Sequence, residues 1–278
     1  MMGWKPIPSH VGTIVAFLVL FAVFLSIGIF LLGETLSQQT YKVRYDTCPL
    51  NEVCVVHINV SAMQAPIIVS YEIDGFYQNM RGYSDSYSDA QLSGKEVPIS
   101  QLSKCGPAKY NANFSTTTSI GGQPLDPAAP AYPCGVIAVT FFNDSYKFTN
   151  NLVAINESGI AWPNDRSKLY KAPANCSSIC WVDPTNEHFI VWSQIAPQSH
   201  FRKIWGRLDQ PLPAGNYSIE IENNYNVSGV GGKKYFVLSQ DTKIGGQELF
   251  LPIVYLISAG LALFFCLYFF IHMVCKKK

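Results

Sequence analysis

The sequence predicts a mostly β ectodomain, an antiparallel β sandwich with long loops, together with two transmembrane α-helices. Three observations lead to this fold class. Long uncharged runs lie near both ends of the chain, short stretches between them alternate apolar and polar residues, and Gly, Pro, Asn and Ser interrupt those stretches at short intervals. Helical periodicity is scarce between the two runs, so the pattern favours strands joined by long excursions.

The first uncharged run, residues 11–33, is long enough to cross a membrane. At about 1.5 Å per helical residue it spans about 34 Å, against about 30 Å for a hydrocarbon core. It is also longer than the apolar core of a cleavable signal peptide, so we interpret it as an uncleaved signal anchor. The second run, residues 251–274, is equally uncharged, and Pro252 marks its first turn.

Charge predicts the orientation of the chain. All 19 acidic residues lie between Glu34 and Glu248, whereas the charged residues outside this segment are Lys5 and the three terminal lysines. Because positive flanks stay in the cytosol, we expect both termini there and the middle of the chain on the lumenal or extracellular side. The expected organisation is a cytosolic N-terminus (1–10), transmembrane helix 1 (11–33), the β domain (34–249), transmembrane helix 2 (250–274) and a cytosolic C-terminus (275–278). The slightly acidic middle segment gives no sign of nucleic-acid binding.

Cysteines and glycosylation motifs agree with this orientation. Cysteines of the middle segment are expected to be oxidised, and we favour sequential pairing because near neighbours meet most easily: Cys48–Cys54, Cys105–Cys134 and Cys176–Cys180. Asn-x-Ser motifs mark candidate N-glycosylation sites in the same segment: Asn59, Asn113, Asn143, Asn156, Asn175, Asn216 and Asn226. Cys266 and Cys275 fall outside it and are interpreted as small hydrophobic residues in or beside lipid.

Three stretches alternate in the manner of half-buried strands. The inward sets are expected to be Val56, Ile58 and Val60 in the first, Ile67, Val69, Tyr71 and Ile73 in the second, and Tyr217, Ile219 and Ile221 in the third, with Ser70, Glu72 and Asp74 on the outer face of the second. Residues 135–142 are apolar on both faces and are predicted to form a central strand. Residues 115–133 are predicted to form a surface loop tied by the middle disulfide.

The segment NEHFIVWSQIAPQSHFRKIWG, residues 186–206, has the composition of an active site. An enzyme would use His188 or His200 as a general base, Glu187 or Asp183 to orient it, and Arg202 to hold an anion. No catalytic motif of suitable spacing accompanies these residues, and the chain has only five histidines. We therefore expect no catalysis, no metal and no cofactor. Residues 189–192 are predicted to be a buried strand, and residues 200–206 a turn whose basic residues are solvated or paired with surface carboxylates.

This segment resembles the NEDFIVW…FRK(L/I)Y block of the cell division control protein 50 family, the accessory beta subunits of type IV P-type ATPases that flip phospholipids. Further similar blocks follow the family's order: Trp4-Lys5-Pro6 with Thr13, FYQNMRGYSDSYSDAQLSG (76–94), PCGVIAVTFFNDSY (133–146), GIAW (159–162), LPAGNYSIEIENNYNV and GGKKYFVLSQDTKIGGQ. The chain departs from the family at Val139-Thr140, where Asn-Ser is usual, and at Lys243, where Trp is common. It also has two cysteines, Cys48 and Cys54, in a cluster where many members have four.

The resemblance implies a subunit without chemistry of its own, in a heterodimer with an ATPase alpha subunit. In the family, the alpha subunit carries the phosphorylated aspartate, the nucleotide site and the lipid path. The beta subunit permits exit from the endoplasmic reticulum and supports the transport cycle, so onward traffic to the Golgi, endosome or plasma membrane is expected. Small-xxx-small pairs in the two predicted helices are candidate docking positions: Gly12/Ala16, Ala22/Ser26 and Ser258/Ala262.

Two other classes of protein share this topology. A ligand-gated channel subunit also has two spans, cytosolic termini and a disulfide-bonded, glycosylated ectodomain, and it would form trimers that conduct ions without a partner. An adhesion or receptor ectodomain is a third alternative, although the short predicted cytosolic tails leave little room for signalling.

Overall fold

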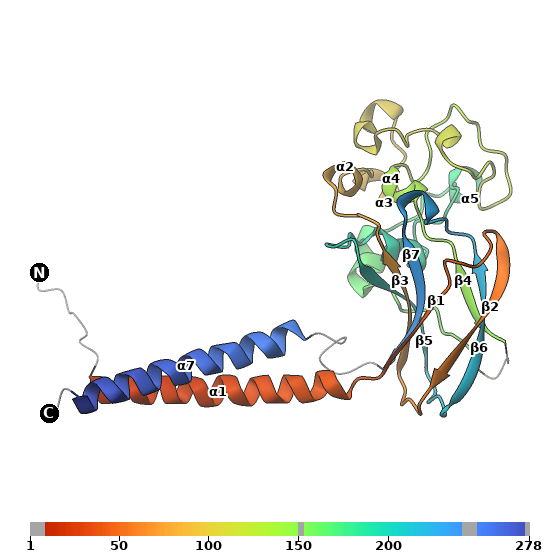
Figure 1. Cartoon of the computed structure of the whole chain (residues 1–278). Coiled ribbons are helices and arrows are strands. Elements are labelled where there is room, and N and C mark those ends of the chain that lie inside the picture. Colours follow the sequence, from red (N-terminus) through yellow and green to blue (C-terminus); the bar gives the residue numbers. More distant parts are fainter. Residues whose placement is uncertain (1–8, 150–152, 241–248, 276–278) are drawn as a thin grey trace, which may run out of the picture. The chain divides into compact units, whose positions relative to one another are not determined.

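The computed structural model describes residues 9–149, 153–240 and 249–275, and these form two compact units (Figure 1). One unit holds the two terminal helices, and the other is the β domain, residues 40–240. The helices are α1 (His10–Ser37), α2 (Arg81–Ser84), α3 (Asp89–Leu92), α4 (Val136–Val139), α5 (Cys176–Ile179), α6 (Glu187–Ser193) and α7 (Phe250–Cys275). The strands are β1 (Thr40–Arg44), β2 (Glu52–Val60), β3 (Ile67–Asp74), β4 (Ser145–Phe148), β5 (Phe201–Leu208), β6 (Gly215–Asn223) and β7 (Lys233–Gln240). Shorter helical turns are η1 (Ile99–Gln101), η2 (Ser103–Cys105), η3 (Asn111–Asn113), η4 (Asp165–Leu169) and η5 (Ser228–Val230).

Some sequence expectations lie outside the described residues. They are those placed on Trp4-Lys5-Pro6, on Lys243 and on the lysines at positions 276–278.

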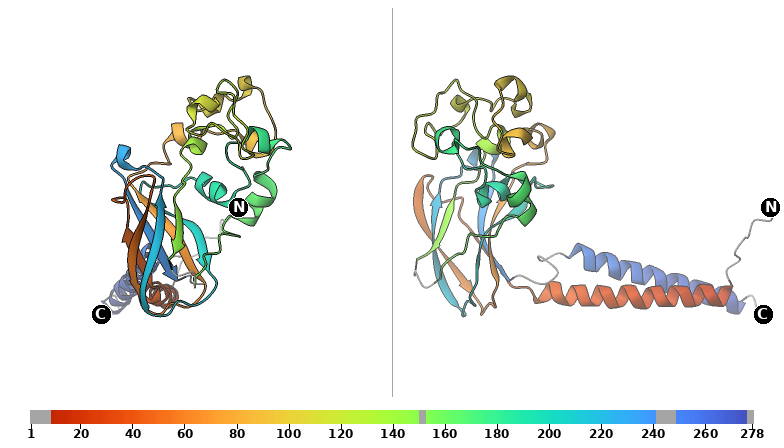
Figure 2. Two further views of the ribbon diagram at one scale, coloured as in Figure 1. Left: turned by 90° about the vertical axis from the view of Figure 1, so that its right-hand side faces the viewer. Right: turned by 180° about the vertical axis from the view of Figure 1, so that it is seen from behind.

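The helices α1 and α7 lie side by side and antiparallel within their unit (Figures 1 and 2). Phe17 stacks on Phe265 with ring centroids 5.5 Å apart, and Phe24 meets Tyr255 at 6.0 Å. A Cβ added to Gly28 would lie 2.9 Å from the side chain of Leu256, so glycine permits the close approach of the two helices here.

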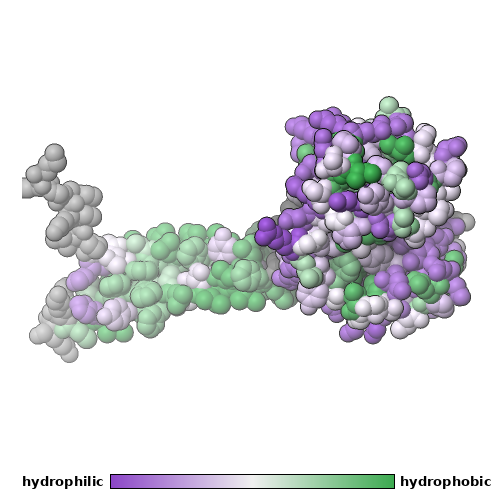
Figure 3. All heavy atoms as spheres, turned by 90° about the horizontal axis from the view of Figure 1, so that it is seen from above, coloured by the Kyte–Doolittle hydropathy of each residue, from purple (hydrophilic) through white to green (hydrophobic). Residues whose placement is uncertain are grey.

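Both helices are long and apolar enough to cross a membrane. The visible surface of this unit is predominantly hydrophobic, whereas the surface of the β domain mixes hydrophilic and hydrophobic residues (Figure 3). Helix α1 begins at an N-cap, where the Ser9 hydroxyl accepts the Gly12 N–H at 3.1 Å. It continues to Ser37, four residues beyond the uncharged run, because neither Glu34 nor the residues after it break a helix.

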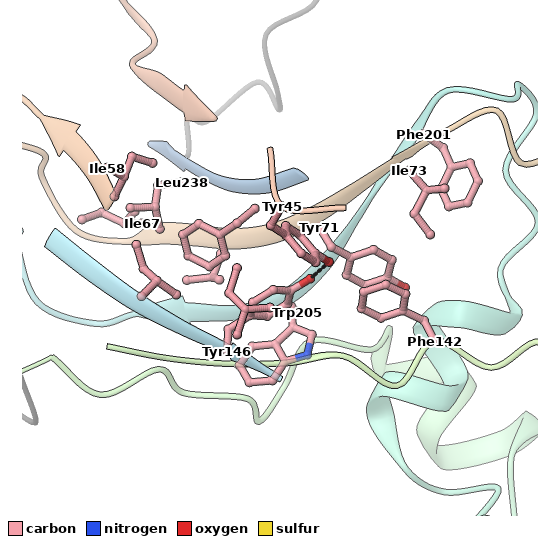
Figure 4. Close-up of a cluster of buried hydrophobic side chains, with 14 of the residues drawn as sticks. Tyr45, Ile58, Ile67, Tyr71, Ile73, Phe142, Tyr146, Phe201, Trp205 and Leu238 are labelled. Carbon is pink, nitrogen blue, oxygen red and sulfur yellow. Dashed lines mark hydrogen bonds between the residues drawn. The ribbon is translucent and has the colours of Figure 1, made fainter. Parts of the chain in front are cut away.

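The β domain is built from two antiparallel sheets. Sheet A has the strand order β1-β7-β3-β5, and sheet B has the order β2-β6-β4. Aromatic side chains fill the space between the sheets (Figure 4), where Tyr71 stacks on Phe142 with centroids 3.8 Å apart and Tyr146 lies edge-on to Trp205 at 5.0 Å. The predicted sandwich with long excursions is therefore confirmed.

Strands β2, β3 and β6 carry their inward residues as predicted. The fully buried side chains include Ile67, Val69 and Ile73 on β3 and Ile219 and Ile221 on β6. Strand β3 is not half-buried, however. It lies between β7 and β5, and its outward Ser70 and Glu72 are also only 2% exposed. Long side chains of β1 and β5 reach over Glu72, as its ion pairs described below show.

The predicted central strand at residues 135–142 is wrong, since residues 136–139 form the single turn α4. Gly135 has a φ of 110°, and a Cβ there would lie 2.1 Å from the Ser86 carbonyl oxygen. The Ser86 hydroxyl also accepts the Val136 N–H at 2.9 Å. This close approach of two backbones, which only glycine allows, turns the chain out of an extended path.

The predicted strand and turn in the segment 186–206 are also wrong. Residues 187–193 form α6, which begins at an N-cap where Asn186 Oδ1 accepts the His188 N–H at 2.8 Å. Four consecutive residues of α6 are buried: Phe189, Ile190, Val191 and Trp192. Residues 201–208, predicted to be a turn at their start, form the edge strand β5. An apolar run of this length fits a buried helix as well as a strand, and the cap decides between them.

Three disulfides join Cys48 to Cys54, Cys105 to Cys134 and Cys176 to Cys180. The last two lie in the excursions between β3 and β5, where strands are sparse. Cys105, Cys134 and Cys180 are at most 2% exposed. The predicted surface loop 115–133 is exposed over much of its length, but Ser119, Ala131 and Tyr132 are buried. The disulfides Cys105–Cys134 and Cys176–Cys180 therefore belong to the packed interior of the excursions.

Candidate functional site

The polar residues of the segment 186–206 are held in structural contacts. The Glu187 carboxylate accepts the backbone N–H groups of Gly159 at 3.0 Å and Ala161 at 2.9 Å, and it binds Arg166 Nη1 at 3.0 Å. Burial raises the pKa of Glu187, but these three donors outweigh it and hold the pKa below its ordinary value. Glu187 is therefore a fixed carboxylate that anchors the GIAW turn, residues 159–162, to α6.

Neither histidine of this segment is paired with the carboxylate expected of a catalytic base. His188 Nε2 lies 2.9 Å from Glu157 Oε2, and its ring packs against Trp205 with centroids 5.1 Å apart. His200 Nε2 lies 3.2 Å from Glu72 Oε1. Asp183 instead accepts the Thr185 N–H at 2.8 Å within its own turn. Two of the candidates, His200 and Arg202, meet at the carboxylate of Glu72, whereas Glu187, His188 and Asp183 each have other partners.

Three basic side chains contact the carboxylate of Glu72 on the outer face of sheet A. Its side chain is 3% exposed, and it pairs with Lys42 of β1, with Arg202 Nη2 of β5 at 3.2 Å and with His200. Arg202 was expected to hold an anion or a surface carboxylate. It instead helps to neutralise a buried carboxylate of the protein itself, so it is not free for a substrate.

Lys203 was expected to be solvated or paired with a surface carboxylate, and this expectation is wrong. The residue is only 7% exposed. Its Nζ donates to the carbonyl oxygens of Trp192 at 2.6 Å, Val191 at 3.1 Å and Gln194, at the end of α6. An ammonium is well placed at the negative end of a helix, but burial lowers the pKa of Lys203 to about 7. Lys203 therefore fastens α6 to β5.

A buried ionic network that the sequence reading missed connects the two sheets. Lys234 of β7 and Asp144, which precedes β4, form an ion pair of 2.7 Å with side chains 1% and 0% exposed. Asp144 also accepts the Tyr45 hydroxyl at 2.7 Å, and that hydroxyl lies 2.6 Å from the hydroxyl of Tyr146 (Figure 4). Lys234 further donates to Asn223 of β6. The sequence did indicate that Lys234 is buried. In KKYFVL (233–238), the alternation of strand residues places Lys234 on the same inward face as Phe236 and Leu238.

One groove of the β domain has a volume of about 830 Å³. Its walls include Tyr87, Leu92, Ile137, Tyr170 and Phe189. Among the described residues there is no group of three His, Cys, Asp or Glu side chains that could hold a metal ion. The groove is lined chiefly by apolar and hydroxyl-bearing side chains, and its charged lining residues are Asp89, Lys95 and Lys168.

The small residues proposed for helix docking differ in exposure. Gly12, Ala16, Ala22 and Ser26 are exposed on the helix pair, and Ser258 is half-buried. Ala262 is buried within the pair, as are Cys266 and two residues that the sequence did not point to, Gly28 and Ala259. Ala262 thus contributes to the contact between the chain's own helices.

The candidate glycosylation sites differ in exposure. Asn156 and Asn175 are half-buried, and Asn156 Nδ2, the atom that a glycan would occupy, donates to Asp209 at 2.7 Å. The remaining five asparagines are exposed: Asn59, Asn113, Asn143, Asn216 and Asn226.

These features define a class: a membrane protein with two apolar helices and a disulfide-bonded β domain, in which Glu72, Glu187, Lys203 and Lys234 are held in contacts of the domain itself. The model of the LEM3 (ligand-effect modulator 3) family, also called the CDC50 family, matches residues 33–278, and the chain belongs to that family.

Similar proteins occur in plants, animals and fungi. ALA-interacting subunit 3 of Arabidopsis thaliana is 31% identical over an alignment that covers 99% of this chain and 83% of that protein. Cell cycle control protein 50C of Mus musculus is 30% identical, with 86% and 80% covered. The phospholipid-transporting ATPase accessory subunit CDC50 of Chaetomium thermophilum is 29% identical, with 78% of this chain and 59% of that protein covered.

Proposed function

We propose that this chain is the non-catalytic beta subunit of a phospholipid-translocating type IV P-type ATPase. Its membership of the CDC50 family is the observation that carries this proposal, together with relatives named for their interaction with an ATPase. The side chains of segment 186–206 agree with it, because Glu187, His188 and Arg202 are all engaged in contacts within the β domain. The ATPase alpha subunit is the partner, and the lipid-translocating chemistry belongs to that partner.

The β domain lies on the lumenal or extracellular side of the membrane, with both termini in the cytosol. The charge distribution of the sequence supports this orientation, as do three disulfides, which persist in oxidising compartments. The two candidate spans, α1 and α7, hold the chain in the membrane. The chain leaves the endoplasmic reticulum with its ATPase and travels onward to the Golgi, endosome or plasma membrane.

The structure suits a scaffold that holds a partner in a fixed state. Disulfides brace the excursions, and buried ion pairs lock the sheets, so the surface offered to the ATPase is preorganised and little freedom is lost on binding. The small residues still exposed on α1, namely Gly12, Ala16, Ala22 and Ser26, are proposed to contact helices of the ATPase, since small side chains allow close approach in lipid.

Affinity isolation of the tagged chain in mild detergent tests the proposal. The expected result is a stoichiometric complex with one type IV P-type ATPase, and retention of each protein in the endoplasmic reticulum when the other is deleted. Isolation of a stable homotrimer that conducts ions without a partner would instead support the channel class. Arrival of the chain at its destination membrane in cells that lack every such ATPase would also overturn the proposal.

A further inference from the structure

Two of the candidate glycosylation sites face each other across sheet B. Asn59 of β2 and Asn216 of β6 are direct partners in the antiparallel register, although 157 positions separate them in the sequence. Both side chains are exposed. The next pair on the same face of the sheet is His57 and Ser218, which are joined by a 3.0 Å hydrogen bond. Cross-strand partners have Cβ atoms about 5 Å apart. Glycans on either asparagine would therefore cover the same part of the sheet.

The side-chain nitrogen atoms of these two residues, to which a glycan is attached, are available in the folded domain. Within residues 9–149, 153–240 and 249–275, neither Asn59 Nδ2 nor Asn216 Nδ2 makes a hydrogen bond, in contrast to Asn156 Nδ2, which is held by Asp209. A glycan on Asn59 or Asn216 breaks no contact of the native structure. The folded domain accommodates modification at both positions.

The strand that carries Asn59 has the properties of an aggregation-prone segment. Residues 53–60, VCVVHINV, contain no Pro, no Gly and no Asp, Glu, Lys or Arg, and β-branched residues predominate. Strand β2 lies at an edge of sheet B, and its outward Val53 and Val55 are 61% and 48% exposed. Long apolar edge strands invite pairing with other chains, and proteins normally protect them with charge, proline or a covering group.

We propose that Asn59 and Asn216 form one functional glycosylation position, in which a glycan on either residue shields the exposed face of β2. A glycan is bulky and solubilising. At about 3.3 Å per residue, Val55 lies about 13 Å along the strand from Asn59. Because the two asparagines are cross-strand partners, either glycan lies over the same valines. This inference rests on the proposed function, because N-glycosylation requires the β domain to lie outside the cytosol.

The test compares four forms of the full chain, expressed together with its ATPase: wild type, Asn59→Gln, Asn216→Gln and the double variant. Glycan number is read from the mobility shift on glycosidase treatment, and folding from the monodisperse fraction in size-exclusion chromatography. Each single variant is expected to lose one glycan at most and to keep the wild-type monodisperse fraction. The double variant is expected to lose most of that fraction to aggregate.

A matched control separates local shielding from a general need for glycans. Ser115→Ala removes one exposed sequon, that of Asn113, which lies in the excursion between β3 and β4. This control is expected to remain monodisperse.

Two rescues of the double variant test the mechanism itself. Glu220→Asn with Glu222→Thr creates a sequon directly opposite Val55, and Glu220→Gln with Glu222→Thr is its glycan-free counterpart. The first rescue is expected to restore the monodisperse fraction and the counterpart is not. Val53→Lys with Val55→Lys is also expected to restore it, since charge on the outward face opposes edge pairing.

Three outcomes overturn the inference. A monodisperse double variant shows that β2 needs no shield, and a single variant as aggregated as the double shows that the two glycans are not interchangeable. Failure of both rescues shows that the effect is not exerted at the valines. A wild-type chain without any glycan is a different result, because it contradicts the proposed orientation and removes the inference with it.

Discussion

Lys234 of β7 and Asp144, just before β4, form an ion pair of 2.7 Å in which neither side chain is more than 1% exposed. The pair joins sheet A to sheet B through the interior of the sandwich, and Asp144 holds Tyr45 and the backbone of Tyr225 in the same network. Breaking a buried pair leaves an uncompensated charge, whose cost exceeds that of losing both charges.

Substitution of one partner of this pair is therefore expected to destabilise the β domain strongly. Lys234→Met leaves Asp144 buried without its cation, and the free energy of unfolding should fall by about 3–5 kcal/mol. Chemical denaturation of the purified protein, followed by tryptophan fluorescence, measures this change. Lys233→Met on the exposed side of the same strand is the control and should change the free energy of unfolding by less than about 0.5 kcal/mol. Equal effects of the two variants would contradict the structural role of Lys234.

Because Lys203 is buried, we expect the free energy of unfolding of the β domain to increase with pH. Burial lowers the pKa of Lys203 to about 7 from an ordinary value of 10.5, so above pH 7 the unfolded chain binds more protons than the folded chain. The contribution of Lys203 to the free energy of unfolding should therefore rise between about pH 7 and pH 10, by at most about 1.4 kcal/mol per pH unit. The difference in stability between wild type and Lys203→Met, measured across this range, should shift in favour of wild type. A constant difference would mean that the ammonium, with its three carbonyl partners, stays charged throughout.

The middle disulfide is expected to contribute more stability than the last one. Cys105 and Cys134 are separated by 29 positions, and Cys176 and Cys180 by 4. In the chain-entropy model, these loops correspond to about 3.6 and about 1.9 kcal/mol. Replacement of each pair by alanines should lower the free energy of unfolding in that order, as measured by denaturation under non-reducing conditions. The reverse order would show that packing around the cysteines outweighs loop closure.

Gly28 is expected to control the packing of the two helices. Any Cβ at this position would meet Leu256 at 2.9 Å, whereas a Cβ at Gly33 of the same helix meets nothing within 4 Å. Gly28→Leu should therefore separate α1 from α7, and Gly33→Leu should not. Disulfide cross-linking between cysteines introduced at Phe17 and Phe265 reports the contact, and its yield should fall in the Gly28 variant alone. An unchanged yield would show that the helices meet elsewhere.

Some of the fold could be predicted from local sequence. Residues 56–60 of β2 and 217–222 of β6 alternate apolar and polar side chains because one side of each stretch packs into the sandwich, whereas Val53 and Val55 break the pattern at the start of β2. The uncharged runs correspond to α1 and α7. Alternation failed at α6, where the buried run FIVW suits a helix and a strand equally, and Asn186 supplies the cap that selects the helix. Alternation also failed at α4, because the backbone of Gly135 is turned by its close contact with Ser86, a residue far from it in the sequence.

The polar contacts of the candidate site were harder to predict. Glu187 and His188 are adjacent, yet their partners, Gly159, Arg166 and Glu157, lie 21 to 31 positions earlier in the same excursion between β4 and β5. Lys234 pairs with Asp144, which lies 90 positions earlier in the sequence. Such pairs become visible only when topology places distant segments together. The composition of segment 186–206 therefore suggested an active site, whereas in the structure its polar side chains hold neighbouring segments of the β domain together.

Reconstitution into phospholipid vesicles tests the central claim most directly. The rate of labelled phospholipid movement on addition of ATP would be measured for the chain alone, the partner ATPase alone, and the two together. We expect no ATP-driven movement with the chain alone and full activity only for the complex. ATP-driven lipid movement by the purified chain alone, or an ATPase whose rate is the same without the chain, would contradict it.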